Sequence, residues 1–439
     1  MNDLPGGWAG ARFGDLCQPS QYGWTTSATT ERTNGLRFLR TTDITKGSVN
    51  WETVPYCVDE PHDPDRYRLA PGDILISRAG SVGFSAYLEQ VEPSIFASYL
   101  IRFRPLESMN GRYLAWFLKS PSYWTQIEKA SSGITLANVN AKKLSAIDVP
   151  IAPAAEQERI VAAVEEQFSR LDAGVAALER AGQNLKRMRA RGVSSLFDPQ
   201  WPRVPLADVL TLISDCPHRT PTYTEREGYP ALRPRDVVGG ELRLETSARV
   251  DAQEYRIQTA RHIPEAGDIV YSRELSYGWA VELPEKPLVC LSQGMVILRT
   301  AKLIPGFLAL FLNSHEGRQQ ADRAATGTAH PHINIRDIRQ YQVPLAAHTD
   351  QRTVIARASE LLADCDRASQ AIAAAKIRAS TLRRAVLSYA FSGKLVSQDA
   401  NDEPAAVLLE KIAVERASSN GHKAVRNRGP RLLREDASK

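Results

Sequence analysis

Three clusters of hydrogen-bonding side chains lie beside turn residues, and each cluster occurs once in either half of the chain. Their hydroxyl, amide, imidazole, guanidinium and ammonium groups can donate hydrogen bonds to a polar or anionic partner or accept them from one. In the N-terminal half, the first cluster is Arg40, Thr41 and Thr42, the second is Arg78 and Ser81, and the third is Thr135, Asn138, Asn140, Lys142 and Lys143. In the C-terminal half they are Arg233 and Arg235, then Arg273 and Ser276, then His330, His332, Asn334 and Arg336.

Motifs for catalysis are missing from the sequence. It has no Gly-x-x-x-x-Gly-Lys-Ser/Thr phosphate loop, so we expect no ATP site. It also lacks the Asn/Asp/Ser-Pro-Pro-aromatic run that a known type of amino-methyltransferase would carry. Asp63, Asp65 and Asp73 have no nearby Glu-x-Lys of a metal-dependent nuclease. We therefore expect a chain that is not an enzyme and binds no cofactor.

Metal-binding and disulfide patterns are equally weak. His330-Pro331-His332 could supply two ligands, but no third ligand of the right type lies at helical spacing. The cysteines are five, an odd number, far apart and without a CxxC pair. This spacing indicates neither a zinc site nor a disulfide framework, and it fits a reducing cytoplasm.

Composition indicates an ordinary globular protein of 439 residues, with 43% hydrophobic and 24% charged residues. No apolar run approaches the roughly 20 residues that span a bilayer, and the N-terminus lacks the features of a secretory signal. The net charge of +5 is weak support for a polyanionic partner. Two stretches, Lys186–Arg191 and Lys423–Lys439, are more strongly basic. They could bind a polyanion, but a solvated helix face for the first and a disordered end for the second explain them equally well.

The chain contains a long internal duplication. Gly72–Arg78 returns as Gly267–Arg273, an offset of 195, and Tyr113–Ser120 returns as Phe307–Ser314, an offset of 194. A repeat of this length is a whole domain with its connector, because solenoid units have only about 20–50 residues. Two copies of one surface suit a target with two similar but non-identical parts.

Each copy divides into a mixed part and a long helical part, which predicts an α+β fold. Short β-type runs bounded by turn residues predict strands, as in Asp73–Ile76 and Tyr99–Phe103, and Gly111–Ser120 predicts a helix. We expect two mixed α/β domains, two spacer helices and a C-terminal segment with a short helix and a basic, disordered tail. The boundaries we expect are 1–155 and 201–349 for the domains, 156–200 and 350–393 for the helices, and 394–439 for the segment.

The helical parts carry a heptad pattern. In the second copy the apolar and small residues step by four and three, from Leu361 to Tyr389, and the first copy keeps this register 194 residues earlier. We predict an antiparallel coiled coil of two helices, each about 40 residues and about 60 Å long. The residues expected at their contact are Leu171, Leu178, Leu185, Met188, Leu361, Ile372, Leu382 and Val386. The alternative is that each helix packs separately on its own domain.

The segments that flank the helices carry a family resemblance. Ile147-Asp148-Val149-Pro150 precedes Glu156-Gln157, and Tyr341-Gln342-Val343-Pro344 precedes Asp350-Gln351. A closing stretch, Phe391–Val396, is followed by Glu403–Ile412. Together with the two Gly-Asp-Ile motifs, the order and spacing of these segments resemble the specificity (S) subunits of type I restriction–modification enzymes, over residues 5 to about 416.

The resemblance implies a division of labour in a larger complex. Two target-recognition domains would each read one half of a bipartite double-stranded DNA sequence, and the paired helices would set the unread spacer. Two methyltransferase (M) subunits would dock on the helices, and two ATP-dependent restriction/translocase (R) subunits would join for cleavage. The S subunit would supply no catalysis, and S-adenosylmethionine, ATP and magnesium would be used by its partners.

Under this resemblance the three clusters become candidate DNA contacts. Arg40 is preferred over Arg37, which could pair with an acid. Asn140 and Asn334 keep one residue type in both copies, which suggests a fold role. Asn138 and His332 differ, which suits discrimination between bases. The repeated Gly-Asp-x-x-x-Ser-Arg motif could stabilise the domain instead of reading DNA.

Departures between the copies indicate that they read different half-sites. Asp350 replaces Glu156, and Glu274–Gly278 replaces Ala79–Gly83. Two other functions remain open at this point. One is a protein-interaction scaffold of two ligand-binding domains on a coiled-coil spacer, without DNA binding. The other is a divergent nuclease that acts alone.

Overall fold

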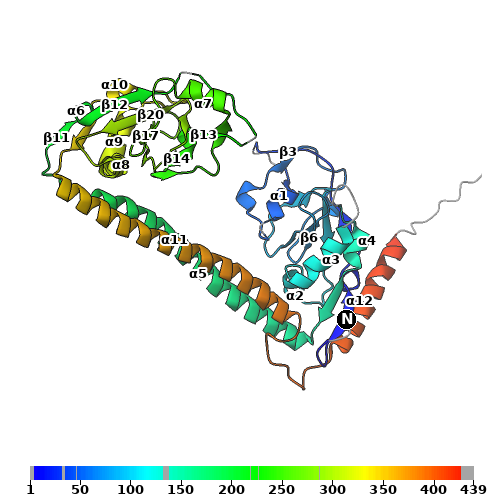
Figure 1. Ribbon diagram of the computed structural model, residues 1–439. Helices are drawn as coiled ribbons and strands as arrows, with labels where there is room; N and C mark the ends of the chain where they lie inside the picture. The colour runs from blue at the N-terminus through cyan, green and yellow to red at the C-terminus, as the bar shows by residue number, and fades with distance from the viewer. Residues whose placement is uncertain are drawn as a thin grey trace, which may run out of the picture. The chain divides into compact units, whose positions relative to one another are not determined.

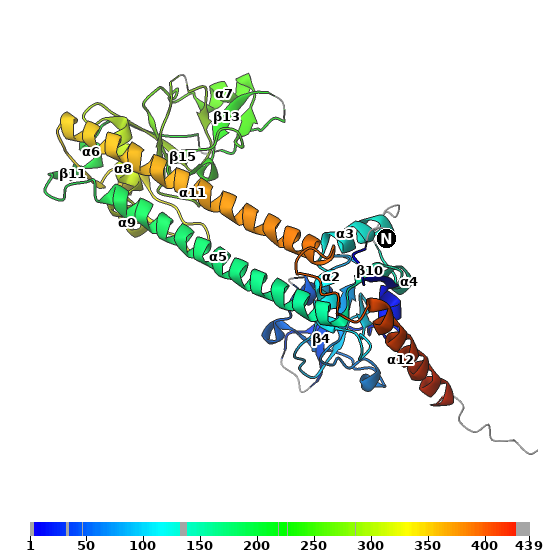
Figure 2. The same ribbon diagram turned by 90° about the horizontal axis from the view of Figure 1, so that it is seen from below.

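The computed structural model describes residues 4–31, 35–45, 47–131, 138–217, 219–225, 227–285 and 287–426, with side chains to residue 418. The chain forms two compact units, the first from residues 1–176 and 376–439 and the second from 177–375 (Figures 1 and 2). The division between the two units falls inside the two long helices. The two ends of each long helix therefore belong to different units, because each end packs against the core of a different globular part. Thr135 and the end of the basic tail lie outside the described residues.

Two four-stranded sheets and one strand pair make up the β structure of the first unit. The central sheet is antiparallel, and its register pairs Ile74 with Phe103. In sheet order its strands are β2 (Gln21–Tyr22), β9 (Leu100–Phe103), β6 (Ile74–Ser77) and β7 (Ser85–Tyr87). The second sheet is β3 (Ala28–Thr29), β5 (Tyr56–Cys57), β4 (Arg37–Leu39) and β8 (Ser94–Phe96), and the strand pair is β1 (Ala9–Arg12) with β10 (Asp148–Ile151). Strand β6 is buried along its whole length, as its apolar sequence predicts.

Helices cover the sheets of the first unit. They are α1 (Thr41–Ile44), α2 (Gly111–Phe117), α3 (Pro121–Ser131), α4 (Ala141–Ser145) and α12 (Ala405–Arg426), with 3-10 turns η1 (Phe13–Leu16), η2 (Trp51–Thr53) and η3 (Pro64–Arg66). Helix α2 buries Tyr113, Leu114 and Phe117 in the main apolar core. Helix α12 is fixed by Glu415, whose carboxylate accepts the backbone N–H groups of Glu107 and Ser108 at 2.7 and 3.1 Å.

The second unit repeats the central sheet. Its strands are, in the same sheet order, β12 (Leu210–Asp215), β20 (Met295–Thr300), β17 (Ile269–Ser272) and β18 (Ala280–Glu282). Smaller sheets are formed by β16 (Ala248–Val250), β13 (Tyr229–Leu232) and β19 (Cys290–Leu291), by β14 (Val237–Val238) and β15 (Glu241–Leu242), and by β11 (Arg203–Pro205) and β21 (Gln342–Pro344). The helices are α6 (Leu206–Val209), α7 (Ala252–Gln258), α8 (Pro305–Asn313), α9 (His315–Ala324) and α10 (Ile335–Ile338), with the 3-10 turn η4 (Pro234–Asp236). The duplication seen in the sequence therefore corresponds to two central sheets with the same order of strands.

The two long helices are α5 (Ala154–Ser194) and α11 (His348–Ala390). They run antiparallel within each unit. In the first unit, Asp172 pairs with Arg383. In the second, Arg189 pairs with Asp366 at 2.9 Å and Gly192 lies against Leu361. The predicted α+β class with paired antiparallel helices is confirmed. No helix among the described residues has the length and apolar character needed to cross a membrane.

The contact line between the helices differs in part from the predicted one. Leu171, Leu178, Leu185, Leu361 and Ile372 are half-buried and Val386 is buried. The expectation for Met188 and Leu382 is wrong, because their side chains are 52% and 49% exposed. The half-buried neighbours at these positions are Arg189 and Arg383. In α5 the four-and-three spacing holds, but every second contact lies one residue further along the chain, while Leu171, Leu178 and Leu185 stay half-buried.

Candidate nucleic-acid interface

The second and third clusters of the first unit are joined by backbone hydrogen bonds. The N–H of Arg78 donates to the carbonyl of Tyr99 at 2.9 Å, and the Arg78 carbonyl accepts from Val139 N–H at 3.0 Å. A β-bridge pairs Ala79 with Asn138. The segment that carries Asn138 therefore lies against the turn that follows β6.

The second unit forms the same frame. The N–H of Arg273 donates to the carbonyl of Gly294 at 2.8 Å, and the Arg273 carbonyl accepts from Ile333 N–H at 2.8 Å. A β-bridge pairs Glu274 with His332. The structure thus brings the second and third clusters together in both copies, although some 60 residues separate them in the sequence.

Serine hydroxyls close the two turns. Ser77 donates to the carbonyl of Ser81, and Ser272 donates to the carbonyl of Ser276 at 2.8 Å. The turn is completed by Gly83 N–H, which donates to the Ser77 carbonyl at 2.9 Å. The backbones of Ser81 and Ser276 therefore hold the turn, and their half-buried side chains lie at its rim.

The aspartate of the Gly-Asp motif has a structural partner. Asp73 is fully buried and accepts hydrogen bonds from Arg104 at 2.7 and 3.0 Å. Asp268 accepts the equivalent pair from Arg299 at 2.7 and 2.9 Å. For the aspartate of the motif, these contacts favour a role in stabilising the domain over a role in reading DNA.

The first cluster requires a correction. Arg40 is preferred in the sequence because Arg37 could pair with an acid. In the structure Arg40 is itself paired, since its Nε and Nη2 each lie 3.1 Å from the Asp43 carboxylate. Arg233 makes the same bidentate pair with Asp236 at 2.9 and 3.1 Å. Both arginines stand immediately before a short helix, so their guanidinium groups stabilise a repeated turn and their charge is neutralised. Thr42 and Arg235 are exposed, and Thr41 is half-buried.

Arg78 lies in an aromatic environment. Its guanidinium carbon is 5.1 Å from the centroid of the Tyr22 ring. Among the described residues, Arg78 Nε and Asn138 Oδ1 are buried atoms without a hydrogen-bond partner. Tyr99, whose carbonyl holds the Arg78 backbone, has a side chain 61% exposed. Tyr22 and Tyr99 are not among the contacts predicted from the sequence, and the feature that points to them is the divergence between the two copies at these positions.

Arg273, also expected to contact DNA, is enclosed. It is 8% exposed, and its Nη2 lies 3.2 Å from the Asp215 carboxylate and 3.4 Å from that of Glu274. Its Nη1 donates to the Ile333 carbonyl at 3.4 Å, while its buried Nε has no partner in the described part of the chain. This arrangement gives no support to the predicted DNA contact, because the Arg273 guanidinium is enclosed and paired with two carboxylates.

Helix capping accounts for part of the third cluster. Asn140 caps α4, since its Oδ1 accepts the Lys143 N–H at 2.9 Å. Asn334 occupies the matching position before α10 and is exposed. The ammonium of Lys143 donates to the Ala130 carbonyl at 2.5 Å, whereas Lys142 is exposed.

The remaining members of the third cluster belong to the second unit. His330 and Arg336 are exposed, and His332 is half-buried. A backbone pair with Thr326 holds His332, each N–H donating to the other's carbonyl at 2.9 Å. Both histidines thus lie at the rim of the turn, within the frame that carries Glu274.

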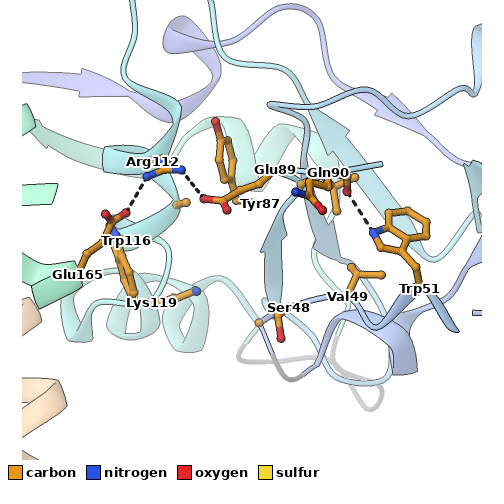
Figure 3. Close-up of a pocket in the computed structure, with 13 residues that line it drawn as sticks. Ser48, Val49, Trp51, Tyr87, Glu89, Gln90, Arg112, Trp116, Lys119 and Glu165 are labelled. Atoms are coloured by element: carbon orange, nitrogen blue, oxygen red, sulfur yellow. Dashed lines mark hydrogen bonds and ion pairs between the residues drawn. The ribbon is translucent and has the colours of Figure 1, made fainter. Parts of the chain in front are cut away.

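A pocket of about 300 Å³ in the first unit lies apart from the clusters (Figure 3). Arg112 bridges Glu89 and Glu165 in its wall, at 3.0 and 3.3 Å. The Lys119 ammonium lies 4.7 Å from the centroid of the Trp116 ring, and burial lowers the pKa of this lysine. Among the described residues, none of the predicted contact residues lines this pocket.

Metal and thiol chemistry find little support in the structure. Within the described ranges, no group of three or more His, Cys, Asp or Glu side chains is arranged to hold a metal ion. The cysteines are buried and unpaired. Burial raises the pKa of Cys57 and Cys216 to about 11 and that of Cys290 to about 12, which keeps these thiols protonated at neutral pH.

Comparison with known proteins places the chain in a family. A family model described as the type I restriction modification DNA specificity domain matches residues 5–181. The EcoKI specificity subunit of Escherichia coli (strain K12) is 24% identical over 427 residues, which cover 90% of this chain and 91% of that protein. The StySPI specificity subunit of Salmonella potsdam is 24% identical, with 90% and 91% covered.

Solved structures share the fold. A chain from a structural study of complex assembly and conformational transition in the type I R-M system superposes with a TM-score of 0.70 at 19% identity, covering 90% of this chain and all of that one. The HsdS subunit from Thermoanaerobacter tengcongensis gives a TM-score of 0.54 at 19% identity, with 89% and 98% covered. These structures show the shared fold. The family-model match and the relatives that cover about 90% of the chain show that it belongs to the specificity subunits of type I restriction–modification systems, the non-catalytic components that give the complex its DNA sequence specificity.

Proposed function

We propose that this chain reads a bipartite double-stranded DNA target, one half with each unit. The observation that carries the proposal is the turn frame, which the two units build from the same backbone hydrogen bonds but fill with different side chains. Asn138 in the first unit corresponds to His332 in the second. A shared frame presents both surfaces in the same way, and different side chains at its rim select different bases.

The proposed contacts are the members of the clusters that the fold leaves accessible. In the first unit they are Thr41, Thr42, Arg78, Ser81, Asn138 and Lys142, and Thr135 is retained as a prediction outside the described residues. In the second unit they are Arg235, Ser276, His330, His332, Asn334 and Arg336. The exposed cations Lys142, Arg235 and Arg336 suit phosphate contacts, which position the protein. Asn138 is proposed to use its amide NH₂ group as a donor to an acceptor on a base edge, such as adenine N7, because its Oδ1 is buried.

The long helices are proposed to carry the partner subunits. Lys186, Arg187 and Arg191 are exposed on α5, so this face is free for an acidic protein surface or for phosphates. Two M subunits and two R subunits would assemble there in the cytoplasm, using S-adenosylmethionine, ATP and magnesium. The complex would methylate adenine within the target and cleave DNA that lacks the modification.

The test is to express the chain with its M subunit and to map methylated adenines across the host genome by single-molecule sequencing. We expect a new gapped, two-part motif that disappears when this chain is omitted. A soluble, assembled complex that produces no new methylated motif would contradict the proposal.

Salt dependence separates DNA binding from the protein-scaffold alternative. Binding to DNA releases counterions, so the logarithm of the affinity should fall linearly with the logarithm of the salt concentration. A protein scaffold predicts no such dependence. The measurement is fluorescence anisotropy of a labelled duplex that contains the mapped motif, titrated at several salt concentrations.

A further inference from the structure

We infer that the two units use non-equivalent residues to contact DNA: Arg78 binds a guanine in the half-site of the first unit, whereas Arg273 is a structural cation with no DNA contact. This inference rests on the proposed function and adds to it which half-site depends on which arginine. It predicts an asymmetry that neither the duplication nor the family suggests.

The two arginines occupy equivalent positions. Both directly follow the central buried strand, β6 or β17, and both hold the same two backbone hydrogen bonds described above. The adjoining strands also correspond, because Tyr22 pairs with Ile101 in the first sheet and Asp215 pairs with Val296 in the second. The backbone therefore cannot be the reason why the two side chains differ.

Two substitutions between the copies change the charge around the guanidinium. Tyr22 and Ala79 in the first unit correspond to Asp215 and Glu274 in the second. Arg273 is neutralised by both of these carboxylates, at 3.2 and 3.4 Å. Arg78, by contrast, has no carboxylate within ion-pair distance in the described part of the chain. It has the face of the Tyr22 ring instead.

The Tyr22 ring orients Arg78 without neutralising it. The ring is itself fixed, because the N–H of Ala141 donates to the Tyr22 hydroxyl at 3.0 Å. A guanidinium packed over a ring keeps its two terminal NH₂ groups in a defined plane, which suits a bidentate contact. Guanine presents the matching acceptors, N7 and O6, in the major groove, and this is the commonest specific arginine contact.

The surface around Arg78 supports an open site. Tyr99 is 61% exposed where the second unit has Gly294, which adopts a φ of +86°. Phe84, whose carbonyl accepts the N–H of Ser77, is 38% exposed. Exposed aromatic side chains thus stand on two backbone segments that hydrogen-bond to Ser77 and Arg78, and a nucleic acid bound at Arg78 would cover this apolar surface.

The experiment is methylation mapping of the complete complex with two variants made separately, Arg78→Ala and Tyr22→Asp. We expect Arg78→Ala to remove a G requirement at one position in one half of the motif and to leave the other half unchanged. Affinity for the motif should fall about 5- to 150-fold, while affinity for unrelated DNA is preserved. Tyr22→Asp should give the same loss with the arginine still present, because the new carboxylate would neutralise it as Asp215 neutralises Arg273.

Matched variants separate this inference from effects on folding or total charge. Tyr22→Phe keeps the ring face over Arg78 and removes only the hydroxyl that accepts the Ala141 N–H, so it should keep the motif. Arg170→Ala removes one positive charge from an exposed pair with Glu166 on α5 and should also keep it. Arg273→Ala should lower the thermal midpoint, because it removes the cation that pairs with Asp215 and Glu274, but the folded fraction should still methylate the unchanged motif.

Three results would overturn the inference. The first is an unaltered motif with Arg78→Ala, and the second is an equal loss of affinity for unrelated DNA, which would make Arg78 a phosphate contact. The third is a relaxed second half-site with folded Arg273→Ala. If the wild-type complex produced no gapped motif, the proposed function itself would fail, and the inference with it.

Discussion

The indole Nε1 of Trp8 donates a hydrogen bond of 2.9 Å to Oε2 of Glu156 in the first turn of α5. The carboxylate is almost completely enclosed, and its other oxygen is a buried atom without a partner in the described part of the chain. This contact fastens the long helix to the start of the first unit. Asp350, the counterpart in the second copy, is exposed.

Replacing Glu156 with Gln should stabilise the protein at neutral pH. Burial raises the pKa of Glu156 above its ordinary value of 4.5, with a smaller opposing contribution from the Trp8 hydrogen bond. A carboxyl group whose pKa is raised on folding favours the folded state at low pH, and this stability is lost as the pH rises through the raised pKa. Glutamine can still accept the Trp8 hydrogen bond and does not ionise. The thermal midpoint of Glu156→Gln should therefore exceed that of the wild type by a margin that grows from pH 4.5 upwards. A margin that does not change with pH would contradict this explanation.

Asp73→Ala should destabilise the first unit by about 2–3 kcal/mol, because it removes charge-assisted hydrogen bonds to a fully buried carboxylate. Asp268→Ala should have a similar effect on the second unit. The control is Asp65→Ala, which breaks a surface pair with Arg68 whose side chains are 83% and 50% exposed, and which should cost at most about 1 kcal/mol. Chemical denaturation measures all three variants. Equal effects of Asp73→Ala and Asp65→Ala would show that the buried pair adds nothing.

Two glycines of α5 should respond in opposite ways to larger residues. A Cβ at Gly174 meets no atom within 4 Å, so Gly174→Ala should raise the free energy of unfolding by about 0.5–1 kcal/mol. At Gly192 an added Cβ would lie 2.6 Å from Leu361 Cδ2, so Gly192→Leu should lower it by about 1–3 kcal/mol through overpacking. Thermal unfolding of both variants is the measurement. A stabilised Gly192→Leu would show that the helices separate easily at this point.

The neighbouring asparagines of the third cluster should separate base reading from folding. Asn138→Ala should weaken binding to the specific duplex by about 1–3 kcal/mol and leave binding to unrelated DNA unchanged. Asn140→Ala should instead cost about 1 kcal/mol of stability, because it removes the cap of α4, and should leave the methylated motif intact. Fluorescence anisotropy and thermal unfolding, measured on both variants, give the comparison. The assignment fails if Asn140→Ala changes the motif and Asn138→Ala does not.

Local patterns in the sequence predicted the elements themselves. The Gly-Asp-Ile-Leu-Ile-Ser run became the buried strand β6, and the repeat at Gly267 became β17 in the same place of an equivalent sheet. The heptad spacing of the helical parts became α5 and α11, paired antiparallel. These features were predictable because turn residues, apolar periodicity and duplication act within a segment or between its copies.

The partners of individual side chains required the tertiary structure. Met188 and Leu382 are exposed, and the neighbouring Arg189 and Arg383 are half-buried instead, where each pairs with an aspartate of the opposite helix. The heptad pattern alone does not show these partners. Arg40 and Arg233 are predicted DNA contacts, but each is paired with the aspartate three residues later in the chain. The Arg-x-x-Asp spacing is visible in the sequence, so these ion pairs could have been predicted from it.

Two copies of one unit, two long helices and polar clusters beside the buried strands are all predictable from patterns in the sequence. Which of the two equivalent arginines is paired with carboxylates depends on the tertiary structure. Asp215 and Arg273 lie 58 residues apart, and Tyr22 and Arg78 are similarly distant in the sequence. Strand register alone brings each pair together, and long-range register depends on the packing of the whole sheet, which no local pattern of residues records.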